Sequence, residues 1–364
     1  MSKISGFLLL TVALSAAEKI DIKAGSNHWA FQPLKEPTLP VVKNKSWPSN
    51  TIDYFILARL EQAGLEPAPP AENRVLQRRI HYALRGLPPN DETDLDKLMS
   101  TPQYGERWAR HWLDVVRYAD SNGLDENAAH ANAWRYRDYV VNAFNSDKPF
   151  NRFVIEQIAG DLLEAKDEVH RRELVTATGF LSLGPKVLAE PDKVKMEMDI
   201  IDEQIDTLGK SFLGLTLGCA RCHDHKFDPI PTADYYALAG IFKSTKTMNS
   251  LKTIAKWHEN PVYTPKEKKL REKSEELIAA QKKVIAAFTQ KVNQELLIER
   301  KLDKLPPKPQ ELYTKSVKAE IEGLQDTLKR LESQAFILPM AMGVADGNAT
   351  ELPIFVRGDH NRPA

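Results

Sequence analysis

Apolar residues recur at intervals of three and four along most of this 364-residue chain, and Asn, Pro or Gly ends each run. Tyr104, Trp108 and His111, for example, share one face of a helix that begins near Pro102. An alternation of apolar and polar residues with period two, which indicates strands, is hardly visible before residue 250. The sequence therefore predicts a mainly α fold. Helices are expected within residues 52–60, 74–84, 101–118, 133–145, 150–163 and 196–217.

The composition permits a packed core but provides no strong overall charge. Hydrophobic residues make up 42% of the chain, which is enough for one large or two medium domains. The 50 Lys and Arg residues balance the 50 Asp and Glu residues. Since nucleic acids attract basic surfaces, this balance argues against a nucleic-acid partner.

The first residues are typical of a secretory signal peptide. Lys3 precedes an apolar run over residues 4–14, and the small residues 15–17 follow. We expect cleavage after Ala17, and therefore a periplasmic or extracellular location; a buried N-terminal helix is the alternative. No later stretch reaches the ~18 to 20 apolar residues that cross a bilayer, so no transmembrane span is expected.

Changes in composition divide the rest of the chain. A Pro-rich lead at 18–50 should be extended, because Pro does not fit a regular helix. Residues 51–250 carry the main helical signals. In the later part of residues 264–335, the spacing between apolar side chains alternates between four and three residues, and Pro306 divides the segment in two. This pattern predicts a projecting antiparallel helical hairpin or coiled coil. Residues 336–364 are interpreted as the start of a truncated second domain.

Both cysteines of the chain lie three residues apart, and a histidine follows directly: Cys219, Cys222 and His223. On one helical turn, two thiols can join the two vinyl groups of haem, and the adjacent imidazole can bind the iron from the same side. The spacing therefore predicts a helical, c-type-haem-bearing domain. Cys219 and Cys222 would attach the haem c covalently, and His223 would be the proximal iron ligand.

Two other uses of the motif stay open. In an oxidising compartment, Cys219 and Cys222 could form a disulfide, although the βαβ pattern of thiol redox proteins is not found. Zinc could recruit both cysteines together with His223 and His225. Four ligands within seven residues do not easily close a tetrahedron, however, which disfavours zinc.

The neighbours of the motif offer supporting contacts. His225 lies too close to His223 to reach the opposite face of the same iron, so we expect it beside a haem propionate or as a satisfied surface histidine. The carboxylate of Asp224 or Asp228, or a backbone carbonyl, would accept the imidazole N–H of His223. The candidates for the distal iron ligand are His111, Met196, Met198 and Met248.

Two polar groups complete the set of candidates. Carboxylates recur at helical spacing over residues 197–206, and a solvated helix face is favoured over an acid/base pair. The second group would line a pocket or hold a cation; its members are Asp120, Asn122, Asp125 and Glu126.

Six segments read HWAFQP, IDYFILARLEQAGLEPAPPA, YGERWARHWLDVVRYADSNG, YRDYVVNAFNSDKPFNRFVIEQIAGDLL, DTLGKSFLGLTLGCARCHDHKFDPI and RGDHNRPA. Together they resemble the planctomycete cytochrome-associated proteins, an exported family of paired domains of unknown function. The resemblance covers about residues 28–245 and implies a helical, haem-associated protein with an electron-transfer role. It carries over only Cys219, Cys222 and His223. It also implies that a separate N-terminal cytochrome domain is missing and that the second paired domain is cut off.

These observations lead to two hypotheses. The first is an exported c-type haem protein that acts in electron transfer or as the haem-bearing part of an oxidoreductase. Its partner would be an exported redox protein or the second domain of the full-length protein. The alternative is a non-redox polysaccharide-binding or scaffold protein in which Cys219 and Cys222 form a disulfide.

Overall fold

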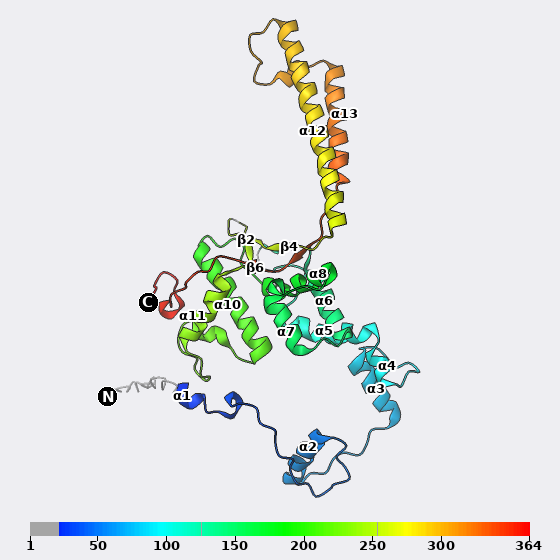
Figure 1. The fold of residues 1–364 in the computed structure, drawn as a ribbon, viewed down its shortest axis with the longest axis vertical. Coiled ribbons are helices and arrows are strands. Elements are labelled where there is room, and N and C mark those ends of the chain that lie inside the picture. The colour runs from blue at the N-terminus through cyan, green and yellow to red at the C-terminus, as the bar shows by residue number, and fades with distance from the viewer. Residues whose placement is uncertain (1–21, 125, 253) are drawn as a thin grey trace, which may run out of the picture.

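A computed structural model describes residues 22–124, 126–252 and 254–364 of the chain (Figure 1). The predicted mainly helical fold is confirmed. The expected signal peptide, residues 1–17, lies outside the described residues. No described helix is long and apolar enough to cross a membrane.

Helices form most of the described structure. They are α1 Ile22–Gly25, α2 Thr51–Gln62, α3 Asn73–Leu84, α4 Leu95–Met99, α5 Pro102–Val115, α6 Ala133–Asn145, α7 Phe150–Ala159, α8 Glu168–Ala177, α9 Gly179–Ser182, α10 Lys193–Leu208, α11 Thr232–Lys243, α12 Pro265–Arg300 and α13 Lys315–Ser333. The helix expected over 196–217 ends at Leu208 and continues as a π-helical turn, Gly209–Leu213. Gly214 follows with φ 67°, a left-handed conformation that glycine adopts without strain and that stops the helix.

The strands are short and pair across the chain. They are β1 Thr245–Lys246, β2 Met248–Ser250, β3 Lys256–Trp257, β4 Glu259–Pro261, β5 Met340–Met342 and β6 Ala345–Asp346. Three antiparallel pairs form, β1 with β6, β2 with β3, and β4 with β5. Because β5 and β6 follow α13, the chain returns to the body after the two long helices.

The later part of the Pro-rich lead and α2 lie away from the body in Figure 1, whereas Gly25 of α1 packs against Pro229. The described part of the lead is irregular apart from α1 and a 3-10 turn at Trp29–Phe31. Glu61 of α2 accepts the backbone N–H groups of Lys43 and Asn44 at 2.9 and 3.0 Å. These bonds hold the end of the lead against α2.

Helices α12 and α13 lie side by side and extend far from the body (Figure 1). Their contacts run antiparallel, because Gln281 bonds to the carbonyl of Leu324 at 2.9 Å and Asn293 accepts from Tyr313 at 2.6 Å. Near the outer end, Tyr313 packs with Val292 and Leu296 in a small apolar cluster of its own. We call this pair of helices the arm.

A largely buried ion pair joins α10 to the loop after α5. Glu203 of α10 accepts from Arg117 through both carboxylate oxygens, and Arg117 also donates to the carbonyl of Leu183 at 2.9 Å. Both side chains are about one-fifth exposed. A Cβ at Gly184 would lie 2.6 Å from each of them, so the close approach requires glycine. The pair therefore fixes α10, which carries much of the candidate site.

We predict that Glu203→Ala lowers the free energy of unfolding by about 3–5 kcal/mol, because it leaves the Arg117 charge buried without its partner. The matched control is Glu295→Ala, which removes an exposed pair with Lys291 on the arm and should cost less than about 1 kcal/mol. Urea denaturation of both variants measures the difference. Equal losses would contradict a special role for the buried pair.

Candidate functional site

The C-x-x-C-H motif lies on the surface between α10 and α11. A 3-10 turn at Leu217–Arg221 carries Cys219, and Cys222 follows directly at its end. Both cysteines are exposed free thiols. Leu217 and Ala220 of the same turn are buried in the main core, so the turn is packed from beneath. Both cysteines thus lie on or directly after one 3-10 turn at the surface.

Arg221 ties this turn to α10. Its guanidinium lies 3.1 Å from Asp199 and 3.5 Å from Asp202. Tyr235 of α11 donates to Asp202 at 2.6 Å. Burial raises the pKa of Asp202, against the lowering effects of Tyr235 and Arg221. Burial also acts to lower the pKa of Arg221, but the carboxylates outweigh it and raise that pKa.

The carboxylates of α10 therefore do more than form a solvated face. Asp199 and Asp202 bind Arg221 of the motif, Glu203 binds Arg117, and Glu197 binds Lys243 of α11. These partners are distant in sequence, which explains why the spacing alone did not identify them.

His223 is exposed and has one local hydrogen bond. Its Nδ1 lies 2.7 Å from the backbone carbonyl of Asp224. Because a carbonyl only accepts, Nδ1 carries the proton and the lone pair is at Nε2. The Asp224 carboxylate is used elsewhere, since it accepts the backbone N–H of Thr232 at the start of α11 at 2.9 Å. The structure thus selects the backbone carbonyl among the acceptors considered for His223.

His225 is a buried structural residue, only 4% exposed, rather than a surface histidine. Its Nδ1 accepts the backbone N–H groups of Phe227 and Asp228 at 3.2 and 2.8 Å. Nε2 therefore carries the proton, and it donates to Thr216 at 2.9 Å. The short distance from Nδ1 to the Asp228 carboxylate is consequently not an ion pair. This histidine holds the loop that follows the motif.

The proposed distal ligands lie in different environments. Met196 and Met198 are each 2% exposed and pack among apolar side chains. Met248 packs beside Met196, half-buried. His111 is exposed on α5, with its ring 5.6 Å from that of Trp108. The methionines thus serve as core packing in this structure.

The second polar group holds a loop together. Asn122 is buried and bonds to the carbonyl of Lys186 and the N–H of Ala128. Asp120 accepts from Tyr118 at 2.7 Å, and Glu126 accepts the N–H of Ala189. Asp125 lies outside the described residues. Within the described ranges, no group of three His, Cys, Asp or Glu side chains has a metal-binding arrangement.

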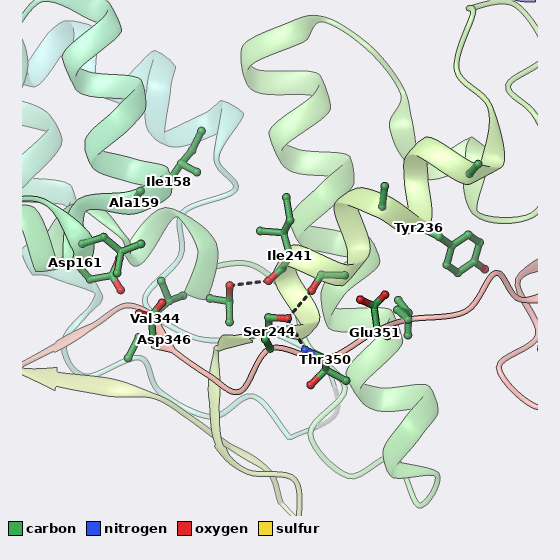
Figure 2. A pocket seen from close by; sticks show the side chains of 18 of the residues that line it. Ile158, Ala159, Asp161, Tyr236, Ile241, Ser244, Val344, Asp346, Thr350 and Glu351 are labelled. Atoms are coloured by element: carbon green, nitrogen blue, oxygen red, sulfur yellow. Dashed lines mark hydrogen bonds between the residues drawn. The ribbon is translucent and has the colours of Figure 1, made fainter.

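A groove of about 830 Å³ lies beside the motif, between α7, α11 and the segment after β5 (Figure 2). Tyr236 lines it and also donates to the backbone carbonyl of Arg221 at 3.0 Å. Asp161, Asp346 and Glu351 place carboxylates along the lining. Burial and the nearby Asp346 raise the pKa of Asp161. Sequence reasoning missed this groove, because its walls come from three separate parts of the chain.

The fold and the site define a class: mainly helical proteins with a surface C-x-x-C-H turn beside a groove. The PSCyt2 family model, described as a protein of unknown function (DUF1549), matches residues 51–247. Since this match spans more than half of the chain, the protein belongs to that family. This agrees with the resemblance to planctomycete cytochrome-associated proteins, although the match itself makes no link to haem. No curated protein and no solved structure was found to match.

The two histidines of the motif provide a matched pair of variants. We predict that His225→Ala lowers the free energy of unfolding by about 2–4 kcal/mol, because two backbone N–H groups lose their buried acceptor. His223→Ala should change it by less than about 0.5 kcal/mol, since that side chain is exposed. Thermal and urea unfolding check both values. A large loss in His223→Ala would show that it, too, is structural.

Proposed function

We propose that this protein is an exported c-type haem protein that acts in electron transfer or as the haem-bearing part of an oxidoreductase. One observation carries the proposal. Two exposed free thiols lie on a single turn, and the histidine that follows keeps the lone pair of Nε2 available. This is the donor set that covalent haem attachment requires.

The chain's own residues fit this cofactor. Cys219 and Cys222 would form the two thioether bonds, and His223 would bind the iron through Nε2. The bond from Nδ1 to the Asp224 carbonyl supports this role, because it fixes the tautomer and makes the imidazole more basic. When bound, a haem supplies one-electron chemistry.

The surroundings of the motif keep the donors in place. Arg221 anchors the turn to the carboxylates of α10, and Tyr236 of α11 bonds to the Arg221 carbonyl. His225 holds the following loop from within. Because the thiols are at the surface, one edge of an attached group would face solvent, which suits electron exchange with an exported partner.

The groove distinguishes the two forms of the proposal. A simple electron carrier needs no substrate site, whereas an oxidoreductase needs one close to the haem. Tyr236 connects the groove with the motif, so the groove is where we expect a substrate of the oxidoreductase to bind.

Expression of the full chain in a periplasm with the haem-maturation machinery tests the proposal. We predict a haem stain on a denaturing gel and a pyridine haemochrome spectrum for the wild type. Cys219→Ala/Cys222→Ala should lose the covalent stain, because both attachment points are removed. His223→Ala should keep the stain but change the absorption spectrum of the folded protein, because the proximal ligand is lost. His28→Ala is the matched control and should resemble the wild type.

Absence of covalent haem in the wild type, while a control cytochrome matures normally, would overturn the proposal. A disulfide between Cys219 and Cys222, detected by mass in that protein, would instead support the polysaccharide-binding or scaffold alternative. If haem is present, spectra with and without carbon monoxide show whether the distal position is open. Variants of His111 and Met248 then test the accessible distal candidates.

A further inference from the structure

A loop from the far end of the chain touches the C-x-x-C-H motif. We call residues 355–363 the C-terminal loop. Gly358 in this loop has φ 74°, and a Cβ built on it would lie 2.8 Å from the Cys222 sulfur and 3.3 Å from Cγ of Arg221. Any side chain at this position would collide with the thiol. The loop backbone therefore packs directly against Cys222.

The loop is closed by its own backbone hydrogen bonds. Val356 donates to the carbonyl of Arg362 at 2.8 Å, and Arg362 donates to the carbonyl of Asp359 at 2.8 Å. Gly358 donates to the carbonyl of Phe355 at 3.0 Å. These bonds give the loop a defined shape, so its approach to Cys222 is a property of the folded loop.

Two anchors hold the loop on the elements that also hold the motif. Phe355 is buried, and its ring meets that of Tyr236 edge-on, with centroids 5.6 Å apart. His360 lies 2.8 Å from one carboxylate oxygen of Asp192, whose other oxygen caps α10. One anchor thus rests on α11 and the other on the start of α10.

We propose that the C-terminal loop is a part of the C-x-x-C-H site that covers one side of the Cys222 thiol. A bulky group joined to Cys222 must then approach from the other side. The loop is a positioning element, and Gly358 is the residue that permits its contact with the sulfur. The effect of the loop on haem attachment rests on the proposed function. Its effect on other reagents that modify Cys222 does not depend on that function.

A designed disulfide tests where the loop lies. In Cys219→Ser/Gly358→Cys, the new Cβ would lie 2.8 Å from the Cys222 sulfur. The corresponding separation in a disulfide is about 3 Å, given the S–S bond length. Mild oxidation should therefore join the two peptides, as seen by mass spectrometry. Cys219→Ser/Gly323→Cys, with its new thiol on the arm, is the matched control and should not crosslink within the monomer.

Alkylation of the full chain tests the effect of the loop on each thiol. His360→Ala removes the hydrogen bond to Asp192 that anchors the loop. Loss of one charge-assisted hydrogen bond should increase the fraction of open loop about tenfold. We expect Cys222 to react up to about tenfold faster with a bulky maleimide, and less so with the small reagent iodoacetamide. The rate at Cys219 should change little, and His28→Ala should leave both rates unchanged.

The outcomes separate the proposal from the haem hypothesis. Failure of the designed disulfide, or an equal response of both thiols to His360→Ala, would overturn the role of the loop even if haem is attached. Absence of haem in the wild type would overturn the haem hypothesis, while the disulfide and the selective change at Cys222 would still support the loop. If His360→Ala does not fold, the designed disulfide alone decides.

Discussion

The ion pairs of α10 are the constraint on which most of the described body depends. Through Glu203 this helix holds Arg117 and the loop after α5, and through Asp199 and Asp202 it holds Arg221 of the motif. Charged groups removed from water are stable only with their partners in place. The position of the thiols is therefore linked to the packing of the whole body, although the thiols themselves are at the surface.

Much of the helical pattern could be predicted from local signals. Pro102 begins α5, as the sequence indicates, and α6 has the bounds expected for the helix over 133–145. The end of α10 was harder to predict than its presence. Its apolar spacing continues past Leu208, but the backbone changes to a π-helical turn before Gly214. Periodicity does not distinguish these two helical forms.

The site was predictable only where its residues are close in sequence. Cys219, Cys222 and His223 are recognised from spacing, and the structure brings them to one exposed turn. The structural role of His225 was not predictable, because its hydrogen-bond partners come together only after folding. Gly358 and Cys222 are far apart in the sequence, and no local pattern predicts their contact.

The length of the arm limits what it can do for the motif. A helix rises 1.5 Å per residue, so the 36 residues of α12 extend about 54 Å. A molecule captured at the outer tip would be kept several nanometres from Cys219 and Cys222. The outer part of the arm is therefore too far from the motif to contact a group attached there.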